Sequence, residues 1–329
     1  AAMVVIGIVL SRRNSNVGDF YLGGRKLGPL VTAMSAEASD MSSYLLMGLP
    51  GLAYLTGGAE VGWTAIGLAI GTYLNWLIVA KRLRVYSHKC GAITIPDFFS
   101  NRYKDDKKVL LGISALIILI FFVPYTASGF SACGKLFNSL ISAVIIIAYT
   151  CTGGFLAAST TDLIQSIVMT LALVSILIFG ISNAGGLGNV IDNAKSIPGY
   201  FSLTSIHNVE TGGADKYSFL TIASLLAWGL GYFGMPHILL RFMAVEDKQK
   251  LKTSRRIASI WVVISMAIAI FIGFIGNALT KKGEFAALSG ADSERVIIKI
   301  AQYMSDHHTA LAVIAGLVFA GILACTMST

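Results

Sequence analysis

The sequence predicts an all-α protein that crosses a membrane many times. Of its 329 residues, 55% are hydrophobic and only 13% are charged, whereas about 25% of the residues in a soluble domain carry charge. Apolar runs of about 20 residues, the length that crosses a bilayer as a helix, recur along the whole chain. Two of these runs are interrupted by glycine, proline and polar residues. Paired interruptions of this kind are typical of secondary transporters that consist of inverted repeats.

The apolar runs predict nine spans, at residues 1–11, 29–55, 61–80, 108–134, 141–158, 163–183, 217–240, 257–279 and 308–329. The first run is too short to cross about 30 Å of hydrocarbon, so we interpret it as part of a span. Almost no loop separates the fourth and fifth runs, which suggests missing residues at Leu140 and Ile141. The polar segments 184–216 and 280–307 are predicted to be outer loops, with short surface helices.

The basic residues predict the orientation of the chain. Its net charge of +8 is not interpreted as nucleic-acid binding, because the charges lie in short loops between spans. With the loop after residues 1–11 placed in the cytoplasm, 18 of the 25 lysines and arginines fall on the cytoplasmic side and 7 outside. Cytoplasmic loops carry such an excess of positive charge. We therefore expect a multi-pass protein of a bacterial cytoplasmic membrane, in contact with the lipid bilayer, with its N-terminus outside.

The sequence does not predict an enzyme. It contains no nucleotide-binding loop, hydrolytic constellation or cluster of metal ligands, and its four cysteines have no metal or redox spacing. The glycines of Gly229-Leu-Gly-Tyr-Phe-Gly234 match a dinucleotide-binding spacing, but they lie inside an apolar span and follow no strand. Transport driven by ATP hydrolysis in this chain is therefore not expected.

The first interrupted span, 29–55, carries two acidic residues and four serines in its middle and ends in Gly-Leu-Pro-Gly51. A carboxylate at mid-membrane costs roughly 2.5–3.5 kcal/mol, so it requires a partner or a polar cavity. Asp40 is the main candidate for a cation or substrate pathway, because the small polar residues beside it favour a broken helix. The alternative is a structural carboxylate that caps a half-helix or pairs with a buried arginine. Glu37, one helical turn away, is a weaker candidate that could face another neighbour.

The second interrupted span, 217–240, contains a cluster of Trp228, Tyr232, Pro236 and His237, in which Trp228, Tyr232 and Met235 or Pro236 follow helical spacing and form an aromatic stripe. Such a stripe is more often packing than a binding site, but the glycines between these residues would open the backbone to a ligand. Because half-helix ends in broken spans hold substrates and ions, we expect the site to lie between the two breaks.

Two further features are candidates for cation binding. The chain ends in two adjacent hydroxyls, Ser328 and Thr329, in an apolar helix. They could bond to backbone carbonyls four residues earlier, which is common, or could contribute oxygen ligands to a hard cation such as Na⁺. Asp162 lies at the predicted cytoplasmic start of the span 163–183 and could instead be a helix N-cap or first-turn acid.

At these residues the sequence resembles the solute:sodium symporter family, and within it the bacterial sodium/proline symporters. The matching stretches cover most of the chain: Leu22-Gly-Gly-Arg-Lys-Leu-Gly-Pro29, Ala38-Ser-Asp-Met-Ser42, Leu45-Leu-Met-Gly-Leu-Pro-Gly51, Tyr149-Thr-Cys-Thr-Gly-Gly-Phe-Leu-Ala157, Trp228-Gly-Leu-Gly-Tyr-Phe-Gly234, Pro236-His-Ile-Leu239, Arg241-Phe-Met-Ala244 and Met327-Ser-Thr329.

The resemblance implies a LeuT-like inverted-repeat fold in one transmembrane domain, with an extra N-terminal span at 1–11. The first repeat would occupy about 29–183 and the second would start within 217–329, with at least two more spans expected beyond the last residue. It implies import of a small solute by alternating access, coupled to Na⁺.

The resemblance also implies roles for individual residues. The carbonyls of Ala38, Met41 and Cys325 and the hydroxyls of Ser328 and Thr329 would hold Na⁺. Asp40, Arg25 and Asp162 would take part in coupling. The substrate pocket would be lined by Ser42, Ser43, Tyr125, Trp228, Tyr232 and Pro236.

Three departures affect the expected substrate, L-proline. Many proline symporters have Ser-Gly-Trp where this chain has Ser42-Ser43-Tyr44, and Gln-Pro where it has Met235-Pro236. Glu37 stands where a glycine is usual. Another small carboxylated solute, such as a different amino acid, pantothenate or a sugar acid, is therefore the alternative. A transporter-like sensor module is a second alternative, and a channel is disfavoured because no pore-lining ring of repeated charge is evident.

Overall fold

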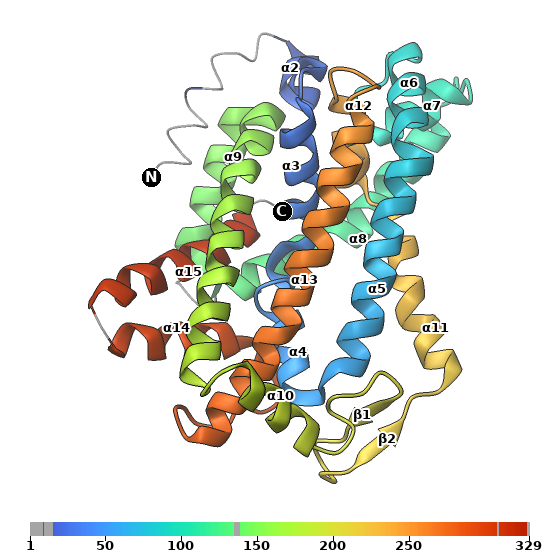
Figure 1. The fold of residues 1–329 in the computed structure, drawn as a ribbon. Helices are drawn as coiled ribbons and strands as arrows, with labels where there is room; N and C mark the ends of the chain where they lie inside the picture. The colour runs from blue at the N-terminus through green and yellow to red at the C-terminus, as the bar shows by residue number, and fades with distance from the viewer. Residues whose placement is uncertain (1–8, 10–15, 135–138, 308, 328–329) are drawn as a thin grey trace.

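The computed structural model describes residues 9, 16–134, 139–307 and 309–327. Figure 1 shows a bundle in which the long helices run roughly alongside one another between two ends of the molecule. The side chains of residues 130–152 and 324–327 are outside the described set, as are the expected partial span at 1–11, apart from residue 9, and the residues 135–138 next to the suspected gap.

The described α-helices follow one another in this order: α2 (Val17–Leu22), α3 (Pro29–Met41), α4 (Gly48–Thr56), α5 (Gly58–Asn75), α6 (Lys81–Lys89), α7 (Ile95–Arg102), α8 (Val109–Gly134), α9 (Ser139–Asn183), α10 (Leu187–Ser196), α11 (Phe219–Ala227), α12 (Pro236–Ala244), α13 (Leu251–Lys282), α14 (Val296–His307) and α15 (Thr309–Met327). Short helical segments of other types are η1 (Gly23–Arg25), η2 (Ser42–Tyr44), π-helical η3 (Trp76–Ala80), η4 (Trp228–Phe233) and η5 (Gly290–Arg295).

In the described residues, four helices are long and apolar enough to cross a membrane: Gly58–Lys89, Val109–Gly129, Gly153–Asn183 and Leu251–Lys282. A fifth span is possible if the bent pair Phe219–Phe233 and Pro236–Ala244 crosses as one unit. These elements coincide with five of the predicted spans. The last predicted span corresponds to the shorter apolar helix Thr309–Leu323.

Both predicted interruptions are present. The first span ends as the helix α3 at Met41 and resumes as α4 at Gly48, with the short helix η2 between them. Ser42 has φ 47° and ψ −153°, a left-handed backbone that few residues other than glycine adopt. In the second span, α11 passes into the 3₁₀ helix η4 and then bends by 45° into α12. The serine- and glycine-rich stretches therefore mark real helix breaks.

The predicted boundary between spans 141–158 and 163–183 is wrong. The helix α9 continues through it and is instead kinked at Gly154, where φ is 63° and ψ is −167°. Only glycine adopts this backbone readily, and Gly154 supplies it. Asp162 consequently lies inside the helix, fully buried, rather than at the start of a span or as an N-cap.

The segments predicted to be outer loops are more ordered than expected. Segment 184–216 contains α10 and a hairpin in which β1 (Ser205–His207) pairs antiparallel with β2 (Ala214–Lys216). The second segment contains α14, whose residues Val296–His307 bury six side chains instead of lying on the surface. The hairpin lies beside the ends of α4 and α5 in Figure 1.

A glycine contact fixes the second broken span against α5. A Cβ at Gly71 would lie 2.3 Å from the carbonyl oxygen of Gly229, and a Cβ at Gly229 would lie 2.0 Å from that of Gly67. Neither distance is possible for a side chain, so glycine is required for the two backbones to approach. Small residues spaced by four allow such contacts between membrane helices. Gly229 therefore serves packing, and not an opening toward a ligand as the sequence suggested.

Candidate functional site

The two helix breaks meet through Asp40 and Tyr232. The hydroxyl of Tyr232 donates a hydrogen bond to the Asp40 carboxylate and accepts one from Thr72 on α5. The Tyr232 carbonyl accepts a bond of 2.8 Å from the amide of Asn75. Tyr232 is only 3% exposed and the Asp40 side chain 4%. A buried carboxylate requires hydrogen-bond partners, and the second broken span provides one for the carboxylate of the first.

Two aromatic rings cover the other side of Asp40. Nε2 of His237 lies 4.0 Å from Oδ1 of Asp40, and the His237 ring stacks on Tyr125 with centroids 5.8 Å apart and planes 17° from parallel. The Tyr125 hydroxyl points at the carbonyl oxygen of Ser39, at 3.4 Å, and accepts a hydrogen bond from Ser42. The break in the first span is therefore enclosed by polar groups from α8, η4 and α12.

The six predicted substrate residues do not form one cluster. Ser42, Tyr125 and Tyr232 converge at the first break, as described above. Trp228 is 52% exposed and contacts the ring of Tyr44 at a centroid distance of 5.6 Å. Ser43 and Pro236 are half-buried beside the breaks. The aromatic stripe expected from α-helical spacing is thus divided, because η4 is a 3₁₀ helix with three residues per turn.

The predicted Na⁺ ligands are described only in part. The Ala38 carbonyl accepts the N–H of Ser42, and the Met41 carbonyl accepts that of Leu45 at 3.2 Å. Each carbonyl oxygen has a second lone pair, so both keep the capacity to bind a cation. Cys325 lies within α15, while the side chains of Cys325, Ser328 and Thr329 are outside the described residues.

A second buried charge cluster joins three helices. Arg241 of α12 donates a hydrogen bond of 2.8 Å to Oδ2 of Asp162 on α9 and another of 2.6 Å to the hydroxyl of Ser35 on α3. Ser35 in turn donates to the same carboxylate oxygen at 2.5 Å. The side chains of Arg241 and Asp162 are 6% and 0% exposed. The predicted span 217–240 ends just before Arg241 and so predicts this residue to be in the following loop, whereas it lies inside α12 and is buried.

Three polar side chains on α9 have unused hydrogen-bonding capacity. Oδ1 of Asp162, the hydroxyl of Ser159 and both amide atoms of Gln165 are buried and have no hydrogen-bond partner in the described part of the chain. They are spaced by three residues and therefore lie along one side of the helix. The helix α15 packs against α9. Buried polar atoms of this kind require an explanation, and an ion or water is one.

Comparison with known proteins gives this arrangement its context. The family model for the sodium:solute symporter family matches residues 20–329. The chain belongs to the sodium:solute symporter family. A sodium/proline symporter of Escherichia coli K12 is 42% identical over 99% of this chain and 64% of its own length. The high-affinity proline transporter PutP of Bacillus subtilis 168 is 40% identical over 99% of this chain and 68% of its own length.

The fold has a counterpart among solved structures. A Na⁺-coupled sialic acid symporter, in a substrate-bound outward-open state, superposes with a TM-score of 0.81 over 99% of this chain and 68% of the other. At 17% sequence identity, this likeness shows the fold alone. Thus the chain is a largely helical, multi-pass membrane protein whose relatives are transporters, and it spans about two thirds of the length of those relatives.

In this family member, Arg25 joins the ends of several helices on one side of the bundle. Its guanidinium donates to the carbonyls of Met243 at 2.8 Å and Ala92 at 2.6 Å, and to the hydroxyl of Ser87 at 3.1 Å. A short parallel bridge between Leu27 and Val245 lies beside it. The predicted coupling residue Arg25 therefore connects the start of α3 with the end of α12 and with the segment after α6.

The residues that sequence reasoning missed are partners of the predicted ones. Arg241 completes the Asp162 cluster. His237, which the sequence placed in the cluster of the second break without a role, covers Asp40. Glu37 accepts a hydrogen bond of 3.1 Å from the indole of Trp76, whose ring packs at a tilt against Phe242 with centroids 4.5 Å apart. Glu37 thus faces a different neighbour from Asp40, as expected. An arginine directly after an apolar run is the one local signal that could have identified Arg241.

Proposed function

We propose that this protein imports a small solute, L-proline, together with Na⁺ by alternating access. The observation that carries the proposal is the 42% identity, over 99% of this chain, to a protein named a sodium/proline symporter. Two broken spans that meet at a buried carboxylate support it, because transporters of this type bind substrate and ions at such breaks. The other named relative is also a proline transporter.

The proposed substrate pocket lies at the breaks. Ser42, Tyr125 and Tyr232 supply hydroxyl groups at the first break, and Trp228 with Tyr44 supplies aromatic surface beside it. Ser43 and Pro236 complete the proposed lining. A carboxylate of the substrate would be favoured near the positive N-terminal ends of the half-helices. Other amino acids, pantothenate and sugar acids have the same carboxylate, so they remain the alternative substrates.

We propose that Na⁺ binds between the first break and the end of α15. The ligands would be the carbonyls of Ala38, Met41 and Cys325 and the hydroxyls of Ser328 and Thr329, which are oxygen ligands suited to a hard cation. Asp40 would support this site by its charge and by its position at the helix break. Since each Na⁺ that crosses the whole field adds about 2.3 kcal/mol per 100 mV, its binding site determines the driving force.

Asp162 and Arg25 are proposed to act in coupling at the cytoplasmic side. The unpartnered oxygen of Asp162 supports a place for it on the cation pathway, and with nearby hydroxyls it would provide a second Na⁺ site. Arg25 would link the cytoplasmic ends of the two broken spans through its bond to Met243. These roles require the helices to separate when the cytoplasmic side opens.

The repeat organisation and orientation are part of the same proposal. The first inverted repeat would comprise residues 29–183, and the second would begin within 217–329, with the extra span 1–11 before both. Lysine and arginine are frequent in α6 and at the start of α13, which lie on the same side of the bundle as α2. This excess supports a cytoplasmic location for that side. The N-terminus would then lie outside.

Uptake measurements test the proposed function. The purified protein would be placed in sealed vesicles with an imposed inward Na⁺ gradient, and entry of labelled L-proline would be followed with unlabelled amino acids, pantothenate and sugar acids as competitors. We expect Na⁺-dependent uptake that excess proline suppresses most strongly. If another carboxylated solute suppressed uptake more strongly than proline, that solute would be assigned as the substrate instead. Absence of uptake of every solute under Na⁺ or H⁺ gradients would contradict transport itself.

A further inference from the structure

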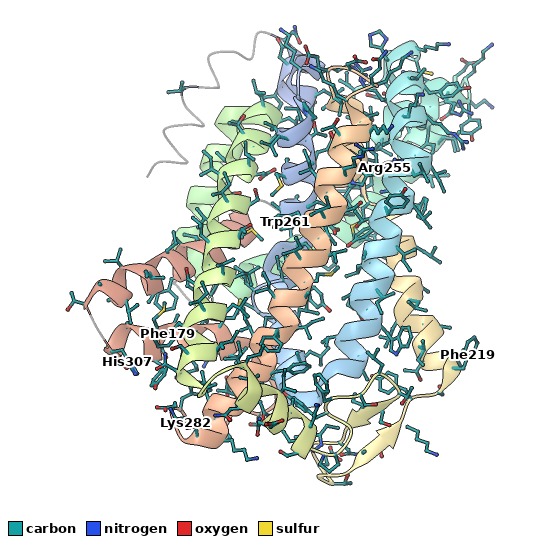
Figure 2. The ribbon with its side chains drawn as sticks, in the orientation of Figure 1. Phe179, Phe219, Arg255, Trp261, Lys282 and His307 are labelled. Carbon is teal, nitrogen blue, oxygen red and sulfur yellow. The ribbon has the colours of Figure 1, made fainter. Side chains whose placement is uncertain are left out.

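We propose that an anionic phospholipid binds in the groove between α3, α9 and α13, with its phosphate on Lys252 and Arg256. The groove has a volume of about 360 Å³ and is lined by apolar side chains that include Met34, Leu173 and Trp261. Figure 2 shows Trp261 between α9 and α13. Neither Asp40 nor Tyr232 lines the groove, and the proposal does not depend on which solute is transported.

The groove has the polarity of an acyl-chain site. Two of the three polar groups in its wall bond to one another, because the Trp261 indole donates to the hydroxyl of Thr170 at 2.9 Å, and Thr170 donates to the carbonyl of Ser166 at 2.7 Å. The Ser265 hydroxyl donates within its own helix, at 3.2 Å to Val262. No polar group of the lining is therefore left to recognise a polar ligand, and an apolar chain is the occupant that fits.

The charge pattern of α13 indicates the class of lipid that fits the groove. Lys252, Arg256, Ile260, Ile264 and Ile268 are spaced by four residues and so form one row along the helix. The two basic residues are exposed, and the three isoleucines line the groove. From Arg256 to Ile268 the helix rises about 18 Å, close to the roughly 15 Å of one bilayer leaflet. The row thus matches a lipid with its phosphate at the cytoplasmic end.

The two basic side chains are available to a phosphate. Neither forms an ion pair within 4.0 Å with any part of the chain that the structure describes. The acids in the preceding loop have other partners: Glu246 pairs with Lys250 at 2.5 Å, and Asp247 accepts the N–H of Gln249 at 2.9 Å. Lysine and arginine at the cytoplasmic surface attract anionic headgroups, and arginine also binds phosphate through paired hydrogen bonds.

Fluorescence quenching by brominated lipid tests the site. The protein would be reconstituted in phosphatidylcholine vesicles that contain a minor fraction of phosphatidylglycerol with brominated acyl chains, and in matched vesicles with the bromine on phosphatidylcholine. The fluorescence of Trp261 would be obtained by subtracting the fluorescence of the Trp261→Phe variant from that of the natural protein. We expect brominated phosphatidylglycerol to quench Trp261 far more than its share of the membrane predicts.

The variant Lys252→Gln/Arg256→Gln should weaken this preference about 30-fold (about 2 kcal/mol), because each basic group near an anionic surface contributes about 1 kcal/mol. The control Arg82→Gln/Lys89→Gln removes two exposed charges from α6 and should leave the preference unchanged. Three results would overturn the proposal: equal quenching by the two lipids, an equal loss in the control, or a Trp261 that neither lipid quenches because another part of the protein covers it.

Discussion

Arg241 and Asp162, which are 79 residues apart in the sequence, form a buried ion pair at 2.8 Å between α12 and α9. Ser35 of α3 bonds to both of them. The pair and Ser35 therefore connect the second half of one broken span and the first half of the other to the part of α9 that follows the kink at Gly154. Any separation of α3, α9 and α12 from one another would require these contacts to break.

Removing one partner of this pair should be strongly destabilising. Arg241→Ala leaves the Asp162 carboxylate buried without a countercharge, and breaking a buried pair in this way costs about 3–5 kcal/mol. Thermal unfolding of the purified protein in detergent checks the direction. The double variant Arg241→Ala/Asp162→Ala should lose less stability than the sum of its single variants, and strict additivity would show that the two charges do not interact.

The hydrogen bond between Tyr232 and Asp40 should matter for function more than for folding. Tyr232→Phe keeps the ring but removes the hydroxyl, so the buried Asp40 carboxylate loses one hydrogen-bond partner. The free-energy cost of leaving a buried polar group without a partner is about 1–3 kcal/mol. We expect weaker solute binding and nearly normal Na⁺ affinity in the absence of solute. Asp40→Asn preserves the shape but removes the charge, and should nearly abolish Na⁺-driven uptake. Binding of solute and Na⁺, measured separately on the purified variants, distinguishes these outcomes.

The contact between Gly71 and Gly229 should not tolerate a methyl group. Gly71→Ala places a Cβ 2.3 Å from a backbone oxygen, so α5 and η4 must separate, at a cost of at least about 1–3 kcal/mol. Gly231→Ala is the matched control, since a Cβ there meets nothing within 4 Å. The midpoint of thermal unfolding should fall for Gly71→Ala and change little for the control. Equal midpoints would contradict the packing of these segments.

Local sequence features predicted the helix breaks and failed to predict what surrounds them. The serines near Asp40 and the glycines near Tyr232 are unusual in apolar spans, so both interruptions were visible in the sequence and are confirmed. The pairing of Asp162 with Arg241 was not predicted, because the two residues are 79 positions apart and the apolar run before Arg241 does not indicate its partner. Asp162 was misplaced because a polar residue was taken to end a span, whereas the chain bends at Gly154.

The aromatic residues of the second break show another limit of prediction from the sequence. Trp228 and Tyr232 are four residues apart and would share one side of an α-helix. In the 3₁₀ helix η4 the same spacing turns them apart, so that Trp228 is exposed and Tyr232 is buried. The sequence contains no signal that distinguishes these two helix types over six residues, and the geometry depends on packing against α5.

The hydroxyl of Thr329 is predicted to be a Na⁺ ligand, and its removal should change the ion dependence of transport. Thr329→Ala should raise the Na⁺ concentration needed for half-maximal uptake. Solute affinity at saturating Na⁺ should change less, because the coupling between the two ligands is reciprocal and is relieved when Na⁺ is abundant. Uptake as a function of Na⁺ checks this, with membrane insertion as the control. An unchanged Na⁺ dependence in correctly inserted protein would remove Thr329 from the site.

The most direct test of coupling is Na⁺ entry driven by the solute. Sealed vesicles that contain the purified protein would have equal Na⁺ on both sides, and an inward gradient of L-proline would be imposed while labelled Na⁺ is followed. Symport predicts that proline accelerates the entry of labelled Na⁺, and that Asp40→Asn nearly abolishes this acceleration. If proline entered the vesicles while the rate of Na⁺ entry stayed the same, Na⁺-coupled proline symport would be contradicted.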